Sequence, residues 1–425
     1  MSRDQKRVII MQPGPLHLFW TTGVFYLWSL KDRFDFALIV PETYRDNAQF
    51  KKVASLPEIR HVEYLPMNGW LSLCFKYSSQ FKQILEKYSP AYILLHNRSY
   101  IENQYLIHWA RKLCVGAKRY YYQNGRMSLM WQDDFKARRA GKIEELANKY
   151  PLFSRNLGLA GRAVDIKNAL IFFLTFKVLP YLAIRSFFTP PVNVTNGSID
   201  REATRRMSNA DNDCLLSYLD IEIDAYRAQG IENVTKIRHP LTTCGLKVFE
   251  FLYGEVVETD SILLLPSYGF TSRMVEAGWE KDSLAQHIAG KWCEAIEKLM
   301  EVFPGYAIKM KLHPASFADP LWKNIIYLIL SQFSTVDIID PNQSAEWHVV
   351  QSAVIVGDVT TVLWWAGMFG GKVVLSLDIF GYPAGDELKG YSGCIHYLNS
   401  LGDIPTLPVY CSVPNFASSL SEVIV

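Results

Sequence analysis

The feature that most constrains the fold is a repeated alternation of short apolar runs with longer amphipathic runs. It occurs in two separate blocks of the chain. Strands that alternate with helices of about ten or more residues indicate a parallel sheet covered on both faces. The first block predicts strands at Arg7–Met11, Phe36–Val40, His61–Leu65, Tyr92–Leu95 and Arg119–Tyr122, and helices at Leu16–Leu30, Phe75–Tyr88 and Asn103–Cys114.

The second block begins near residue 260 and has the same alternation. Between the blocks, Asp211–Arg227 is predicted to be a helix, because Asn209 or Asp211 can cap its start and Gly230 can end it. The second block predicts strands at Ile262–Leu265, Ala307–Leu312, Val336–Ile339, Ala353–Val356 and Lys372–Leu377, and helices at Ser283–Val302, Leu321–Phe333, Ser344–Gln351 and Thr360–Phe369.

The segment between the blocks breaks this rhythm. Residues 189–198, TPPVNVTNGS, are the strongest linker signal in the chain. We therefore predict an α/β protein with two Rossmann-like parallel-sheet domains, 1–200 and 201–425, and a C-terminal tail able to pack back on the first domain. Ligands of open α/β sheets bind outside the carboxyl ends of the strands, so a central cleft between the domains is the expected site.

Composition excludes several classes of function. The net charge is +2, without the concentrated basic face that duplex nucleic acid requires. The chain has no G-x-x-x-x-G-K-[ST] loop, no G-x-G-x-x-G after a strand and no metal-holding Asp-x-Asp, so we expect no NAD, FAD or metal cofactor. The seven scattered cysteines and the short apolar run at the N-terminus favour a cytoplasmic protein with reduced thiols.

An apolar insertion near 165–190 has its own interpretation. Residues 168–188 are strongly apolar but are interrupted by Lys177, Pro180 and Arg185, which makes a spanning helix the weakest interpretation. The alternatives are a buried helix at the domain junction and an interfacial helix on the cytoplasmic face of the inner membrane.

Two sites in the second half carry the main chemical prediction. His313 and Pro314 follow a predicted strand, in the run Lys311-Leu312-His313-Pro314, where an imidazole can donate a hydrogen bond to a phosphate. Thr360 and Thr361 follow the strand that ends at Gly357 and begin a helix, whose N-terminus favours an anion. A histidine that only caps its turn and a plain threonine cap are the simpler alternatives. The loop Ser267-Tyr268-Gly269, with Arg273, is a further candidate for binding a phosphate or a base.

The first half offers candidates for the acceptor side. Gln123 and Asn124 follow its last predicted strand and can orient hydroxyls, although an amide is a poor proton acceptor. His17 lies in the first turn after the run Pro13-Gly14-Pro15-Leu16, and a bland turn is the alternative. Asp133, Asp134 and Glu102 offer carboxylates. A second His-Pro pair, His239-Pro240, precedes no clear anion-binding helix start.

These motifs resemble the bacterial GT-B glycosyltransferases that use CMP-activated sialic acid or Kdo, the group of capsule polysialyltransferases, lipooligosaccharide sialyltransferases and Kdo transferases. The resemblance lies in His313-Pro314, Thr360-Thr361 and Pro15-Leu16-His17. It implies a GT-B-like fold in which His313 and the threonine pair bind or protonate the phosphate of the leaving CMP. The same positions also resemble polymerases that use CDP-glycerol.

One position departs from that family. The sialyltransferases carry an acidic-acidic-Gly motif in the N-terminal half, and this chain has Gln123-Asn124-Gly125 at the matching position. We therefore expect the general base to be another residue, with His17, Asp133, Asp134 and Glu102 as candidates.

The expected function is transfer of an acidic sugar from its CMP donor to a bacterial surface glycan or lipid-linked glycan, without a metal. The alternatives are a GT-B transferase with a UDP-sugar or CDP-glycerol donor, and a non-catalytic nucleotide- or glycan-binding protein.

Overall fold

Two parallel sheets organise the chain in the computed structural model. The first belongs to a unit of Met1–Arg238 with Ala417–Val425, and the second to a unit of His239–Phe416. The structure describes residues 7–14, 16, 19–65, 70–96, 101–122, 149–150, 159, 162–163, 212–218, 223–224, 227, 232–268, 271, 274–275, 278–340, 343–358, 360–369, 372–380, 395–406 and 419–424.

In the described part of the chain, the first sheet has seven strands in the order β3-β2-β1-β4-β5-β6-β7, and all of these pairings are parallel. Its central strands are buried almost throughout, which explains why they are near-continuous apolar runs in the sequence. The strands are β1 (Val8–Gln12), β2 (Asp35–Pro41), β3 (Ile59–Leu65), β4 (Tyr92–Leu95), β5 (Lys118–Tyr122), β6 (Asp213–Ser217) and β7 (Val234–Lys236).

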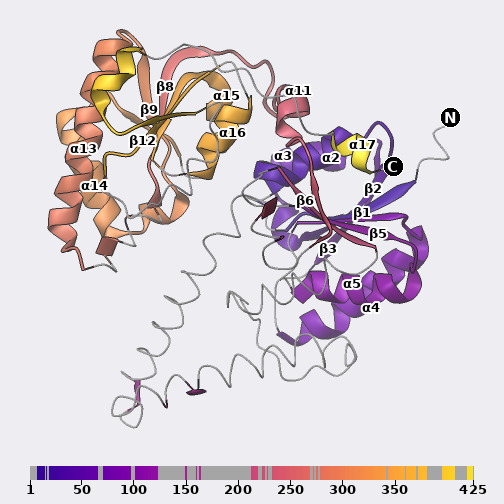
Figure 1. Cartoon of the computed structure of the whole chain (residues 1–425). Helices are drawn as coiled ribbons and strands as arrows, with labels where there is room; N and C mark the ends of the chain where they lie inside the picture. The colour runs from indigo at the N-terminus through magenta and orange to yellow at the C-terminus, as the bar shows by residue number, and fades with distance from the viewer. Residues whose placement is uncertain are drawn as a thin grey trace. The chain divides into compact units, whose positions relative to one another are not determined.

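Helices cover both faces of the first sheet (Figure 1). The helices α4 (Trp70–Tyr88) and α5 (Ile101–Leu113) pack together on one face. The π-helix η2 (Phe19–Gly23) leads into α2 (Val24–Leu30), which contacts α17 (Leu420–Val423) from the C-terminal end of the chain. Among the described residues, this unit also contains η3 (Glu42–Tyr44) and α3 (Ala48–Ala54).

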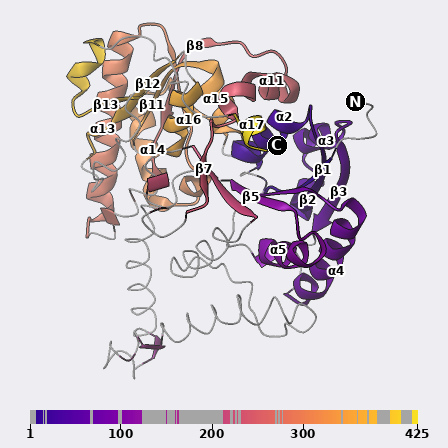
Figure 2. The same ribbon diagram turned by 45° about the vertical axis from the view of Figure 1, so that its right-hand side comes forward.

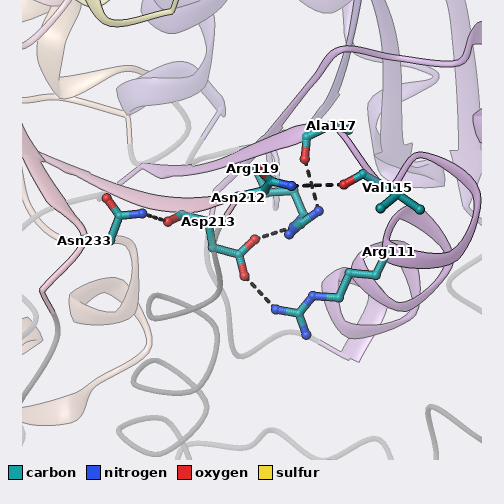
Figure 3. A network of polar contacts seen from close by, with 7 residues as sticks. All are labelled: Arg111, Val115, Ala117, Arg119, Asn212, Asp213 and Asn233. Carbon is teal, nitrogen blue, oxygen red and sulfur yellow. Dashed lines mark hydrogen bonds and ion pairs between the residues drawn. The ribbon is translucent and has the colours of Figure 1, made fainter.

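A buried ionic network joins β5 to β6 at the amino ends of these strands (Figure 3). The Asp213 carboxylate is fully buried and accepts hydrogen bonds from Arg119 Nε and, at 2.7 Å, from Arg111 Nη2. The amide of Asn233 donates to the Asp213 carbonyl, which also links β6 to the residue preceding β7. Side chains therefore support the pairing of strands that are far apart in the chain.

The second sheet, as far as the described residues define it, has six strands in the order β10-β9-β8-β11-β12-β13, again all parallel. Figure 2 shows β11, β12 and β13 side by side. The strands are β8 (Thr259–Leu265), β9 (Ala307–Met310), β10 (Asp337–Ile338), β11 (Ser352–Gly357), β12 (Val373–Leu377) and β13 (His396–Leu398).

The helices of the second unit begin at side-chain caps that the sequence supplies. Glu280 accepts hydrogen bonds from Asp282 N and Ser283 N at the start of α13, and Asp319 accepts one from Leu321 N at the start of α14. The faces of α13 and α14 form one core with the sheet, around the buried rings of Trp292 and Trp322. The helices that the described residues define from end to end include α11 (Leu241–Tyr253), α13 (Lys281–Val302), η5 (Pro314–Phe317), α14 (Pro320–Gln332), α15 (Ala345–Gln351), α16 (Thr361–Phe369) and η7 (Leu401–Thr406).

One predicted element is wrong in its first part. Within the predicted helix Asp211–Arg227, the segment Asp213–Ser217 is the strand β6, which pairs with β5 and β7, whereas residues 223–224 and 227 are helical. The run Asp213-Cys214-Leu215-Leu216-Ser217 is short, and periodicity cannot separate a short buried strand from a helix. Because β6 and β7 extend the first sheet, the first unit continues to Arg238 rather than to residue 200.

The C-terminal segment returns to the first unit, where Leu420 and Ile424 are buried and Tyr120 Oη donates to the Val423 carbonyl at 3.4 Å. The apolar insertion near 165–190 lies outside the described residues. Among the helices that the structure describes, none is long and apolar enough to cross a bilayer.

Candidate functional site

Three loops meet at the carboxyl edge of the second sheet. They follow β9, β8 and β11, which are adjacent parallel strands with Met310 opposite Leu264 and Gly357 opposite Leu265. Because adjacent parallel strands end at one edge, the structure brings His313, Tyr268 and Thr360 to the same edge of this sheet. The ends of β9 and β11 lie about 10 Å apart, at two interstrand spacings.

The rings of Tyr268 and His313 stack across this edge. Their centroids are 5.6 Å apart and their planes differ by 15°. His313 is exposed, whereas Tyr268 is half-buried and packs against the core of the unit. The phenol ring thus orients an imidazole that remains accessible to a ligand.

Lys311 has a different environment from the neighbouring His313. It is 6% exposed, and its Nζ donates to the Leu312 carbonyl at 3.2 Å. Burial lowers the pKa of Lys311, and the charges of Glu346 and Asp340 oppose that shift. The described contacts of Lys311 therefore support the turn that leads into His313.

Gly357 lets β11 end close to β8. A Cβ at this position would lie 2.9 Å from the Leu265 carbonyl oxygen and 3.2 Å from Leu363 Cδ1. After the buried Asp358, Thr360 Oγ1 accepts a hydrogen bond from Val362 N at 3.5 Å as α16 begins. The first backbone N–H groups of α16 and the Thr360 hydroxyl form an arrangement that favours a phosphate.

The structure places the predicted site residues to different degrees. For Pro314, Thr361 and Glu102 it describes the backbone, which belongs to η5, α16 and α5 respectively. Ser267 is described, at the end of β8, where its carbonyl accepts a hydrogen bond from Thr271 Oγ1 at 3.3 Å. The predicted residues outside the described part are His17, Gln123, Asn124, Asp133, Asp134, Gly269 and Arg273.

The sequence analysis missed a histidine at the corresponding edge of the first sheet. His96 directly follows β4, and its backbone N–H donates to the Gln12 carbonyl of β1 at 3.0 Å. It is 3% exposed and lies edge-on to Tyr122, with ring centroids 5.8 Å apart. Its position just after the predicted strand Tyr92–Leu95 is the signal that could have identified it.

The second His-Pro pair does precede a helix. His239 Nδ1 accepts a hydrogen bond from Leu241 N at 3.1 Å, so the buried imidazole itself lies at the start of α11. Burial lowers the pKa of His239 to about 3. A neutral imidazole therefore caps this helix. Among the described residues, no group of three His, Cys, Asp or Glu side chains can hold a metal ion.

The chain matches no family model and no curated protein. Its fold is similar to that of UDP-GlcNAc 2-epimerase from Methanocaldococcus jannaschii, with a TM-score of 0.54 and 12% identity over 94% of this chain and 91% of that chain. A second similar structure is UDP-GlcNAc 2-epimerase from Neisseria meningitidis bound to UDP-GlcNAc, with a TM-score of 0.50 and 12% identity over 94% of this chain and 89% of that chain. The fold is therefore GT-B-like, with two parallel-sheet α/β domains.

Proposed function

We propose that the chain is a glycosyltransferase that takes its sugar from a nucleotide-activated donor, whose phosphate binds at the carboxyl edge of the second sheet. The observation that carries this proposal is that His313, stacked on Tyr268, and Thr360 at the start of α16 follow adjacent parallel strands of one sheet. A fold seen in proteins of nucleotide-sugar metabolism supports the same class of substrate.

The proposed chemistry needs only groups that stabilise a departing phosphate. An acceptor hydroxyl attacks the anomeric carbon and passes its proton to a general base. The bond from that carbon to the phosphate oxygen breaks, and the electron pair leaves with the phosphate. An N–H of His313 donates to that oxygen, while Thr360 and the N-terminus of α16 bind the remaining charge. No step requires a metal, and the general base remains a prediction among His17, Asp133, Asp134 and Glu102.

The proposed donor is a CMP-activated acidic sugar, sialic acid or Kdo, and the acceptor a bacterial surface glycan. Its support is the resemblance of His313-Pro314 and Thr360-Thr361 to the CMP-sugar transferases. A lipid-linked acceptor would bring the protein to the inner-membrane surface, where residues 165–190 are the candidate contact. Retention on liposomes of the full chain, compared with a chain whose residues 171–174 are changed to serine, tests that contact.

The second candidate is a transferase with a UDP-sugar donor. The observation that favours it is that the two similar structures described above are both UDP-GlcNAc 2-epimerases. Unfolding temperatures measured with CMP, UDP and CDP separate the candidates, because a ligand stabilises the folded state according to its occupancy. The largest shift with CMP supports the first candidate and the largest with UDP the second, while no shift with any nucleotide rejects both.

His313 gives the proposal its sharpest test. We expect His313→Ala to lower turnover with the identified donor by about 10²- to 10⁴-fold, the range for a group that assists proton transfer. Its unfolding temperature should stay near that of the wild type, because the side chain is exposed. The matched control is His61→Ala, in the edge strand β3 of the other unit. Equal turnover of His313→Ala and wild type contradicts the role of His313, and nucleotide binding without product formation favours a non-catalytic binder.

A further inference from the structure

Four tyrosines gather near the carboxyl edge of the first sheet. Tyr122 ends β5, Tyr218 follows β6, Tyr26 belongs to α2 and Tyr44 to η3. All four are buried, with exposures of 5% or less. We call Tyr26, Tyr44, Tyr122 and Tyr218 the phenol cluster.

Tyr122 lies at the centre of this cluster. Its ring stacks on Tyr26, with centroids 4.5 Å apart and planes differing by 24°, and lies edge-on to His96. Tyr44 Oη donates to the Gly14 carbonyl at 2.7 Å. The Tyr122 hydroxyl, in contrast, is buried without a hydrogen-bond partner among the described residues. A buried hydroxyl without a partner destabilises a fold, so its presence at the edge where α/β proteins bind ligands calls for a function.

Two glycines keep the surroundings of Tyr122 small. Gly23 has helical backbone angles of φ −57° and ψ −43°, where alanine is normally the more stable residue. A Cβ on Gly23 would lie 3.2 Å from Tyr122 Oη and 3.1 Å from Pro13 Cβ. Gly14, at φ +78°, would place a Cβ 2.4 Å from His96 Nδ1. The sequence thus has hydrogen atoms, rather than methyl groups, beside the unpartnered hydroxyl and the imidazole.

The cluster suits a neutral ligand. Burial raises the pKa values of Tyr26 and Tyr122 well above the usual range, and neighbouring phenols add to both shifts. These phenols therefore stay protonated at neutral pH, and the neighbouring groups that add to the shifts are Tyr218 for Tyr26, and Tyr44 and Tyr26 for Tyr122. A protonated phenol can donate a hydrogen bond to a hydroxyl oxygen and accept one from a hydroxyl proton.

We propose that Tyr122 Oη binds a hydroxyl group of a neutral sugar at the carboxyl edge of the first sheet, beside Gly14, Gly23 and His96. This inference rests on the proposed function for the ligand class and deepens it, since the sugar is then the glycan acceptor. The Tyr122 hydroxyl is buried, so the ligand has to displace neighbouring protein atoms to reach it. Tyr122 orients the hydroxyl and does not deprotonate it.

Saturation-transfer NMR on the full chain tests this site with three neutral probes, methyl β-galactoside, methyl β-glucoside and N-acetylglucosamine. We expect at least one probe to bind the wild type, and Tyr122→Phe to weaken that binding by about tenfold, the effect of one hydrogen bond. Tyr122→Phe should unfold at the same temperature as the wild type or higher, because it removes a buried hydroxyl without a partner. If the Tyr122 hydroxyl had only a structural role, Tyr122→Phe would lower the unfolding temperature and leave binding of the sugar probe unchanged.

The matched control is Tyr121→Phe, the neighbouring tyrosine that points to the opposite face and belongs to the α4–α5 core. It should leave probe binding unchanged. Gly23→Ala is the second variant, since its methyl group would crowd the Tyr122 hydroxyl and should weaken binding of the same probe. Failure of all three probes to bind the wild type, or equal binding by wild type, Tyr122→Phe and Gly23→Ala, overturns the inference. The shifts of the unfolding temperature with CMP, UDP and CDP test nucleotide binding by the second unit separately. The proposed function and the proposed sugar site can therefore fail independently of each other.

Discussion

The two sheets share one topology, yet their edges carry opposite chemistry. At the amino ends of the strands, the first sheet buries a carboxylate, Asp213, held by Arg119 and Arg111. The second sheet buries an ammonium group instead, because Lys372 Nζ donates to Glu258 and to the Ser352 carbonyl, both at 2.7 Å. The difference lies in the partners. The side chain of Arg119 is 4% exposed, whereas that of Glu258 is 55% exposed.

The carboxyl edges of the two sheets also differ in the side chains that they present. Around Tyr122, the edge of the first sheet has buried phenols and closely packed glycines. The edge of the second sheet presents an exposed imidazole at His313 and the start of α16. One βα framework can therefore support a site for neutral hydroxyls and a site for a phosphate, because the residues after the strands decide the chemistry.

The largest expected effect is at the amino edge of the first sheet. Asp213→Ala would leave the buried Arg119 guanidinium, which cannot lose its proton, without its carboxylate. We expect the free energy of unfolding of the first unit to fall by about 3–5 kcal/mol. Hydrogen exchange of the backbone amides of β5 and β6 measures the free energy of unfolding of the first unit separately from that of the second. Amide protection equal to that of the wild type would contradict the assigned role of the network.

The next prediction concerns acid stability of the second unit. The pKa of His239 is about 3 in the folded state, against about 6.5 when unfolded, so the unfolded state binds more protons between these values. The contribution of neutral His239 to the free energy of unfolding is complete above pH about 6.5. As the pH falls this contribution is lost, and the loss reaches about 3 kcal/mol at pH 4. His239→Asn retains a cap for α11 but does not titrate. Its stability should depend less on pH between 6.5 and 4, and an identical pH dependence would refute this account.

Gly357→Ala separates packing from ligand binding at the carboxyl edge of the second sheet. Its methyl group would meet the Leu265 carbonyl oxygen at 2.9 Å, so we expect a loss of about 1–3 kcal/mol in stability and a smaller thermal shift with nucleotide. The control is Gly290→Ala in α13, where a Cβ meets nothing within 4 Å and alanine should stabilise the helix. Equal stability of Gly357→Ala and wild type would show that β8 and β11 tolerate the added atom.

The smallest effect is expected for the buried lysine. Lys372→Met removes a buried charge whose partner, Glu258, stays in contact with water, so its unfolding free energy should change by less than about 1 kcal/mol. Chemical denaturation measures the change beside that of Asp213→Ala. A loss as large as that of Asp213→Ala would remove the proposed difference between the two sheets.

The sequence was most informative where the local signal was long. Periodicity located the strands around β1, β4, β8 and β11 to within a few residues. It failed at Asp213–Ser217, where five residues have no periodicity of their own and long-range pairing with β5 selects a strand. His313 and Thr360 could be selected because each follows a predicted strand, whereas the contact of Tyr268 with His313 could not be predicted.

By itself, then, the sequence determined that the chain forms parallel α/β sheets and which residues stand after the strands, because hydrophobic periodicity and capping are local properties. Only the tertiary structure decided the strand order. That order sets β8 between β9 and β11 and stacks Tyr268 on His313, and it places Tyr122 beside His96 and Gly23. The physical reason is that strand order depends on packing between segments distant in the chain, and no local pattern encodes that packing energy.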